Sequence, residues 1–408
     1  MLFGSAFALA LSSLPLLATA APVPDEPRIE YDAVIVGGGP AGLAALSGLA
    51  RVRRHALLID SGEYRNGPTR HMHDVLGYDG VTPAYYRDAA RKQLSSYSTV
   101  SMTNGTVTKI EPQANNTYFK VSGQYFDDKE RKQIAVTARK VVLATGLRDL
   151  LPPTAGIREN WGKGIYWCPW CDGHEHADQG LGLLAPLESV PGLVREILTL
   201  NRDIVAFVNG TDTPATRATT EDKSPRWQDY LKLHGVRVEN RTIAAVVRLA
   251  NGTTGHEDPS RPTAPEHDLF EVQFVGGGEP VRRNAFLASF KEEQATTLGA
   301  DTGVALYGGR LAADSTKGLV TNIPGVYAIG DANSDNVTNV PHALFSGKRT
   351  AVYLHVQLER ETAAKELAAL PEGNATTTKR SVDEEARSVW DVMNGRADDL
   401  LYAGEFDQ

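Results

Sequence analysis

The sequence has little cysteine, no excess of positive charge and no long apolar run beyond its first twenty residues. Two cysteines in 408 residues exclude a framework of structural disulfides. With 42 Lys and Arg against 50 Asp and Glu, the formal net charge of -8 offers no basic surface for nucleic acid. No stretch after residue 20 is long and apolar enough to cross a bilayer. The 41% hydrophobic content and the length are those of a globular protein with two domains.

The first twenty residues are typical of a secretory signal peptide. Residues 2–20 carry no charge, are rich in Leu and Ala, and end in the small-x-small cleavage pattern Ala-Thr-Ala. They lack the basic residue that usually opens such a peptide. A membrane anchor is the alternative, but the apolar run is short for a span and is interrupted between residues 12 and 15. We therefore expect a signal peptide at residues 1–20 and a secreted, extracellular protein.

Glycosylation sequons agree with secretion. One or two N-x-Ser/Thr triplets arise by chance, whereas seven behind a signal peptide favour an N-glycosylated protein. Asn336 is the weakest of these acceptors because it lies beside a motif that we assign below to a cofactor. The sequons begin at Asn104, Asn115, Asn209, Asn240, Asn251, Asn336 and Asn374.

The two cysteines, Cys168 and Cys171, are separated by two residues. A pair at this spacing closes and opens a small disulfide, which is redox chemistry more often than architecture. Because the chain has no other cysteines, we predict that this disulfide is functional. The rest of the sequence must then supply the donor and the acceptor of its electrons.

A strand, a glycine-rich turn, a helix and a second strand follow one another from residue 31. We expect strands at residues 31–36 and 55–59, a helix at 43–52, and an acid, Asp60, at the end of the second strand. This order is that of a βαβ unit that binds a dinucleotide, with the pyrophosphate at the helix N-terminus and the acid on a ribose hydroxyl. The turn consists of Gly37, Gly38, Gly39, Pro40, Ala41 and Gly42.

Three of these glycines have separate expected roles. Gly37 permits the tight turn, Gly39 lets the backbone approach a pyrophosphate, and Gly42 lets the helix pack closely on the strand. Further along, residues 118–121 and 134–138 indicate a hairpin that leads into a buried strand and the turn Ala144-Thr145-Gly146.

A second unit is expected at residues 156–284, inserted into a first domain formed by residues 28–155 and 285–360. Its expected elements include strands at 181–184, 204–208 and 236–238 and a helix at 193–200. The first domain is expected to close with a long helix from residue 341. Residues 366–408 form a C-terminal extension, with one expected helix at 382–393.

The glycine turn, Ala144-Thr145-Gly146, the Cys-x-x-Cys pair and Gly330-Asp331 occur in the order typical of one flavoprotein family. Over residues 31–358 the chain resembles the thioredoxin-reductase-like FAD-dependent disulfide oxidoreductases. The resemblance implies an α/β fold of two Rossmann-like domains, that of the class II pyridine nucleotide-disulfide oxidoreductases. The FAD domain would be discontinuous, the second domain inserted, and the protein a homodimer.

The resemblance also implies where FAD lies. The first glycine turn would bind the pyrophosphate and Asp60 the ribose, while Gly330 and Asp331 hold the ribityl chain. The helix that follows would direct its N-terminus at the flavin, with Val340 and Ala343 beside the isoalloxazine. The polar loop 61–80 is interpreted as a surface loop or as a loop that flanks the flavin. Other expected cofactor contacts are Asn66, Ala144, Thr145 and Gly146.

The chain departs from the family where a reductase binds NADPH. The family has a second glycine fingerprint in the inserted domain, followed by a basic cluster for the 2′-phosphate. Here the strand 181–184 runs into Ala185-Pro186-Leu187-Glu188, which has no glycine. After the next strand, Arg217 is the only nearby base. The entry route for electrons from NADPH is therefore predicted to be missing.

If nicotinamide delivers no electrons, thiols are the expected donor and dioxygen the acceptor. The pattern is similar to secreted fungal sulfhydryl oxidases and to dithiol oxidases of the gliotoxin type, which implies oxidation of small thiols with release of hydrogen peroxide. Three alternatives remain open. They are an NADPH-dependent thioredoxin-reductase-like disulfide reductase, a dithiol oxidase of a secondary-metabolite pathway, and a flavin-bound protein without turnover. Nucleic acid and membranes are not expected partners.

The resemblance assigns roles to the residues around the cysteines. Cys168 would be the interchange cysteine that exchanges with substrate, and Cys171 would pass electrons to the flavin. Asp172 matches the acid of the family, and His342, His174 and His176 are candidate bases because a histidine pKa is near working pH. We predict no metal site, since His71-Met72-His73 has no third ligand nearby.

Overall fold

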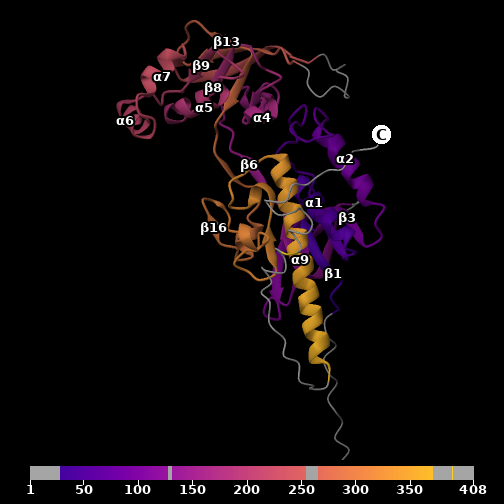
Figure 1. The fold of residues 1–408 in the computed structure, drawn as a ribbon. Coiled ribbons are helices and arrows are strands. Elements are labelled where there is room, and N and C mark those ends of the chain that lie inside the picture. The colour runs from indigo at the N-terminus through magenta and orange to yellow at the C-terminus, as the bar shows by residue number, and fades with distance from the viewer. Residues whose placement is uncertain (1–27, 127–130, 254–264, 371–387, 389–408) are drawn as a thin grey trace, which may run out of the picture.

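The computed structural model describes residues 28–126, 131–253, 265–370 and 388. The expected signal peptide, the sequon at Asn374 and the helix expected at 382–393 lie outside the described residues, apart from residue 388 within that helix. In the described part of the chain, no helix is both long and apolar enough to span a membrane. Two domains are evident in Figure 1, the second above the first, joined by extended segments that include β6.

The first domain is built on a six-stranded sheet whose parallel part has the order β3-β2-β1-β5-β18. Buried β-branched and aliphatic residues fill β1 and β2, as parallel strands covered on both faces require. The expected hairpin is confirmed, because β4 pairs antiparallel with β3 and β5. The strands are β1 (Tyr31–Val36), β2 (Ala56–Asp60), β3 (Val100–Gln113), β4 (Tyr118–Phe126), β5 (Arg131–Leu143) and β18 (Val326–Ala328).

Two helices of this domain, α1 and α9, pack closely on each other. A Cβ added to Gly347 of α9 would lie 2.2 Å from the carbonyl oxygen of Ala41, so only glycine permits this approach. The contact brings the N-terminal ends of both helices to the same side of the sheet. The remaining elements are α1 (Pro40–Arg51), α2 (Pro83–Leu94), α8 (Leu298–Asp301), β16 (Leu306–Tyr307), β17 (Arg310–Leu311), the 3-10 turns η2 (Ser315–Lys317) and η3 (Gly330–Ala332), and α9 (Val340–Ala368).

The second domain has a parallel five-stranded sheet of order β10-β9-β8-β14-β7 and a small antiparallel sheet, β11-β12-β13. The predicted strand at 181–184 is confirmed residue for residue as β8. The strands are β7 (Ile165–Tyr166), β8 (Leu181–Leu184), β9 (Ile204–Phe207), β10 (Arg237–Glu239), β11 (Ile243–Ala250), β12 (Leu269–Phe274), β13 (Val281–Arg283) and β14 (Ala285–Ala288). The helical elements are α3 (Ile157–Asn160), α4 (Pro169–Asp172), η1 (Leu187–Ser189), α5 (Val190–Ile197), α6 (Pro214–Lys223) and α7 (Trp227–Leu233).

The expected return to the first domain at residue 285 is wrong by a few residues. β14 begins at Ala285 and pairs with β8 and β7, so it completes the sheet of the second domain. Its four residues are all buried, which this central position requires. The chain returns with β15 (Glu292–Gln294), which pairs antiparallel with the outgoing β6 (Leu147–Asp149).

Candidate active site

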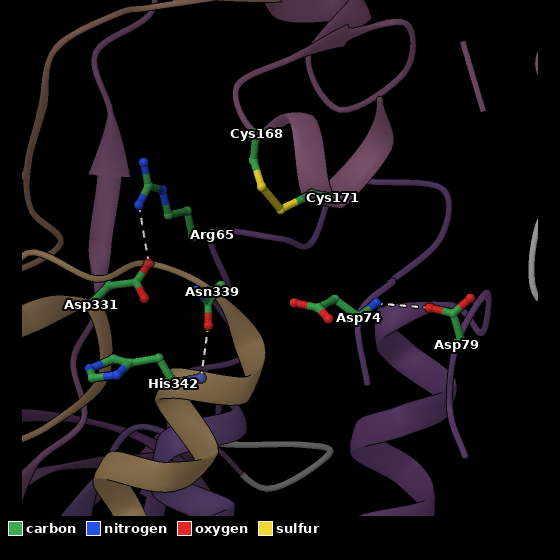
Figure 2. Close-up of a disulfide and its surroundings, with 8 residues drawn as sticks. All are labelled: Arg65, Asp74, Asp79, Cys168, Cys171, Asp331, Asn339 and His342. Carbon is green, nitrogen blue, oxygen red and sulfur yellow. Dashed lines mark hydrogen bonds and ion pairs between the residues drawn. A yellow bond between two sulfur atoms is a disulfide. The ribbon is translucent and has the colours of Figure 1, made fainter. Parts of the chain in front are cut away.

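A cavity of about 1310 Å³ is lined by residues of both domains. The first domain contributes the glycine turn after β1, the loop after β2 and the N-terminal end of α9, while the second domain contributes α4 with both cysteines. Figure 2 shows the disulfide above the first turn of α9, with Arg65 and Asp331 to one side. The sequence motifs that predicted cofactor and redox chemistry therefore meet at one place.

The glycine turn has the shape that a dinucleotide pyrophosphate needs. Gly37 has φ +112°, and a Cβ there would lie 2.3 Å from the carbonyl oxygen of Ala144. A Cβ on Gly42 would lie 1.9 Å from the carbonyl oxygen of Gly37, which explains the close packing predicted for this residue. At Gly39 no protein atom lies within 4 Å of an added Cβ, so the turn opens onto free space at the start of α1.

Most other predicted cofactor residues also line the cavity. Val340 and Ala343 lie at the start of α9, where Asn339 caps the helix by accepting the backbone N–H of His342 at 2.8 Å. This helix N-terminus carries partial positive charge that suits an electron-rich group. The predicted residues that line the cavity are Gly37, Gly39, Pro40, Ala41, Asn66, Ala144, Thr145, Gly146, Gly330, Asp331, Val340 and Ala343.

Asp60 lies behind the glycine turn and does not line the cavity. Its buried carboxylate accepts the backbone N–H of Gly62 at 3.0 Å, the hydroxyl of Tyr64 and the guanidinium of Arg91. A Cβ on Gly38 would collide with this carboxylate. Asp60 therefore shapes the turn from behind, and the neighbouring Ser61, Glu63 and Asn66 reach the cavity instead.

Asp331 is held by a buried guanidinium. Arg65 donates to Asp331 at 3.1 Å (Figure 2). It also donates to Asp149 at 2.7 Å and contacts Glu292. Burial alone would lower the pKa of Arg65, but the carboxylates around it raise that pKa above its ordinary value. Burial raises the pKa of Asp331, which the charge of Arg65 opposes. The side chain is thus fixed beside the cavity where the ribityl chain was expected.

The disulfide is closed between Cys168 and Cys171, whose Cα atoms are 5.2 Å apart, and both residues line the cavity. Two tryptophans flank it in different ways. Trp167 stacks on Trp161 with ring centroids 5.0 Å apart, whereas Trp170 is 71% exposed. Trp167 therefore belongs to the packed wall of the site, and Trp170 presents an apolar surface beside the sulfur atoms.

Asp172 follows Cys171 directly and also lines the cavity. Burial raises the pKa of Asp172 well above its ordinary value, and the charges of Glu266 and Glu175 raise it further. A carboxyl group whose pKa is raised in this way is suited to exchange a proton with a thiol, as an acid or as a base.

The three predicted histidine bases do not line the cavity. His342 Nε2 lies 2.7 Å from Asp335 Oδ2, and in Figure 2 its ring extends sideways from α9 and not toward the disulfide. His174 is exposed. His176 is buried against the ring of Tyr166, and burial lowers its pKa.

Two other histidines, His71 and His73, do line the cavity. Loop 61–80, which was expected either at the surface or beside the flavin, thus reaches the cavity, and no chemical role was expected for these histidines. His176, Glu266 and Asp268 also bring three metal-type ligand atoms within 4.8 Å of one another. The guanidinium of Arg70 already contacts both carboxylates there, at 2.8 Å from Asp268, and supplies the positive charge that a metal would.

In the second domain, the turn after β8 is closed. Leu187 is 0% exposed and packs in the core, and its backbone N–H donates to Thr211 Oγ1 at 3.0 Å. Arg217, the base that the sequence suggested for a 2′-phosphate, pairs with Asp212 at 2.7 Å, and Lys223 pairs with Glu188 of the turn at 3.3 Å. The turn thus has no glycine, and the hydroxyl of Thr211 already accepts a backbone N–H that a pyrophosphate would need.

Comparison with known proteins agrees with the cofactor motifs and the cysteine pair of the site. A model of the family "Pyridine nucleotide-disulphide oxidoreductase" matches residues 31–184. A "Probable thioredoxin reductase" of Arthroderma benhamiae is 44% identical over 395 residues, which cover 93% of each chain. "Thioredoxin reductase tcpT" of Claviceps purpurea is 30% identical over 78% of this chain and 90% of its own. An oxidoreductase from Agrobacterium tumefaciens has a similar structure, with a TM-score of 0.66, 26% identity, and coverage of 81% of this chain and 99% of its own.

The fold and the site define a flavin-dependent disulfide oxidoreductase. The chain belongs to the thioredoxin-reductase-like group of the pyridine nucleotide-disulfide oxidoreductases, an FAD-binding family. The open glycine turn, the fixed Asp331 and the N-terminus of α9 are the residues that would hold FAD here.

Proposed function

We propose that this oxidoreductase is a thiol oxidase, which converts two thiols and dioxygen into a disulfide and hydrogen peroxide. The closed turn after β8 is the observation that carries the proposal. That turn has no glycine and the N–H of Leu187 already donates to Thr211, which supports the absence of a cradle for the pyrophosphate of NADPH. The electrons would then enter the protein from substrate thiols, through the Cys168–Cys171 disulfide.

The proposed chemistry is two thiol exchanges in sequence. A substrate thiolate attacks Cys168 Sγ, the disulfide breaks, and Cys171 leaves as a thiolate. A second substrate thiolate attacks the substrate sulfur of this mixed disulfide, so that Cys168 leaves as a thiolate and the substrate disulfide is released. Two thiols lose two protons and two electrons, which dioxygen takes up as hydrogen peroxide. Bound FAD supplies the two-electron chemistry that links the dithiol to dioxygen.

The names of the relatives favour a second function. Both relatives described above are called thioredoxin reductases, which supports an NADPH-dependent disulfide reductase with a divergent nucleotide site. In that enzyme the electrons would leave through the disulfide instead of entering there. A dithiol oxidase of a secondary-metabolite pathway shares the oxidase chemistry and differs only in its substrate.

We further propose that the protein acts outside the cell on small thiols, as an N-glycosylated homodimer. The exposed position of the sequon residues Asn104, Asn115, Asn209, Asn240, Asn251 and Asn336 supports glycosylation. The exposed ring of Trp170 beside the disulfide supports an open approach for substrate. Glycosidase treatment of the secreted protein tests the glycosylation, and sedimentation analysis tests the homodimer.

Oxygen uptake tests the proposed activity. Purified protein is mixed with glutathione or dithiothreitol, and the oxygen consumed and the peroxide formed are measured. We expect one peroxide per disulfide and no requirement for NADPH. A Cys171→Ser variant that retains its flavin should consume no oxygen. Uptake that is absent with every thiol tried, or that is unchanged in this variant, would refute the oxidase.

A further inference from the structure

A buried pair of titratable side chains lies between α4 and the loop after β2. His73 Nε2 is 3.4 Å from Glu175 Oε1, and the two side chains are only 7% and 5% exposed. Neither atom has a hydrogen-bond partner within the described residues. Buried polar atoms nearly always have such partners, so an unsatisfied pair indicates a role other than stability.

On one side, the pair leads to the protein surface. His73 Nδ1 lies 3.6 Å from Asp79 Oδ1, and the side chain of Asp79 is 35% exposed. Asp79 is held in place because it accepts the backbone N–H of Asp74 at 2.8 Å (Figure 2). A proton on the ring of His73 is therefore one step from a carboxylate that meets solvent.

On the other side, the pair leads to the disulfide. Glu175 follows Asp172 by three residues in the turn after α4, and its charge acts on the carboxyl group of Asp172, whose pKa it raises. Asp172 lies in the cavity wall directly after Cys171, and His73 lines the same cavity.

We propose that Glu175 and His73 carry protons between Asp172, beside the disulfide, and Asp79 at the surface. Each substrate thiol that becomes a thiolate gives up one proton, which Asp172 accepts and passes along this path to water. The proposal rests on the proposed function only through thiol exchange at the disulfide. A reductase would use the same path in the opposite direction.

The path crosses the boundary between the domains. Asp172 and Glu175 belong to the second domain, whereas His73 and Asp79 belong to the first. Arg70 of the first domain holds Asp268 of the second at 2.8 Å, close to the path. Besides the four residues of the path, the charged or titratable groups that face it are His71, Tyr166, His174, Glu266 and Arg70.

The test is the rate at which dithiothreitol reduces the flavin under nitrogen, which does not depend on the acceptor. We expect His73→Asn and Glu175→Gln each to slow this step about tenfold or more at neutral pH. The double variant should be no slower than the slower single variant, because the residues act in series. The defect should disappear at high pH, where the substrate is already a thiolate, and added imidazole should restore the rate of His73→Gly.

Matched substitutions of exposed residues serve as controls. His267→Asn and Glu279→Gln replace exposed side chains of the second domain and should leave the rate unchanged. Circular dichroism and the flavin spectrum identify variants that fold and retain FAD, and His73→Gln provides a second variant if His73→Asn does not. Rates within twofold of the wild type across the pH range would overturn the proposal. A uniform loss at all pH values would also overturn it, since that indicates a structural role. Loss of oxygen uptake with normal flavin reduction would instead count against the oxidase alone.

Discussion

The two domains repeat the same local arrangement, a buried strand, a turn and a helix, yet their turns have opposite properties. After β1, an added Cβ at Gly39 would meet no protein atom within 4 Å. After β8, the corresponding turn contains Leu187 with no exposed surface. A strand–turn–helix unit can bind a dinucleotide pyrophosphate where its turn leaves backbone N–H groups and space free. The turn after β1 leaves such space, and the disulfide lines the same cavity as this turn.

The largest effect is expected from a side chain placed in the open turn. Gly37→Val should abolish FAD binding, because Gly37 has φ +112° and its Cβ would overlap the carbonyl of Ala144. The visible absorbance of the purified protein measures the loss. Gly192→Ala, near the start of α5 in the second domain, is the matched control. A Cβ there meets nothing within 4 Å, so this variant should keep its FAD. Equal FAD content in both variants would contradict the contrast between the turns.

The acid beside the disulfide is expected to have the next largest effect. Asp172→Asn should slow flavin reduction by dithiothreitol about 10²- to 10⁴-fold, which is the usual contribution of a general acid or base. Stopped-flow spectroscopy under nitrogen measures the rate. A decrease of less than threefold would remove Asp172 from the mechanism.

The same substitution makes a prediction about stability and pH. Because the folded state raises the pKa of Asp172, the folded protein binds this proton more tightly than the unfolded chain does. The free energy of unfolding therefore falls as pH rises from the unfolded pKa toward the folded one. Asp172→Asn removes this loss, so its melting temperature should rise relative to that of the wild type as the pH increases above about 4. A difference that is constant with pH would contradict the pKa shift.

A smaller effect is expected when the buried side chain of Leu187, in the turn after β8, is shortened. Leu187→Ala should lower the free energy of unfolding by about 2–5 kcal/mol, as for other buried leucines, and should not create NADPH oxidation. Urea denaturation and an NADPH assay measure the two outcomes. If the variant remained fully stable, Leu187 would not be the packing residue described here. A gain of NADPH oxidation would show that this side chain alone blocks the nucleotide.

The smallest effect is expected from substitution of Arg217, a base near the turn after β8. Arg217 is about half exposed in its pair with Asp212, so Arg217→Ala should change the free energy of unfolding by at most about 1 kcal/mol. Thiol oxidation should be unaffected. In an NADPH-dependent enzyme that uses this residue for the 2′-phosphate, the same variant would raise the KM for NADPH, which distinguishes the two functions.

Local sequence patterns predicted the first domain well. The strand expected at residues 31–36 is β1 without any shift, because a run of buried residues next to a glycine turn is specified locally. The end of the second domain was harder to predict. Ala285–Ala288 is an apolar run that suits either sheet, and its assignment depends on pairing with β8, far away in the sequence.

The site was predicted where motifs are contiguous and missed where contacts are distant. Both cysteines, Asp172 and most residues of the cofactor motifs line one cavity as expected. His342 was chosen for its position at the start of α9, but Asp335 orients its ring elsewhere. His73 was set aside because no third metal ligand lies near it in the sequence. Its partner Glu175 comes from the other domain and is visible only after folding.

The most direct test of the central claim compares two reductants under nitrogen in a stopped-flow spectrometer. The FAD-loaded protein is mixed with NADPH or with dithiothreitol, and the flavin absorbance is followed. The account predicts rapid bleaching by dithiothreitol, reversed by air with release of peroxide, and no bleaching by NADPH on the same timescale. Rapid bleaching by NADPH would contradict it and would identify the protein as a reductase.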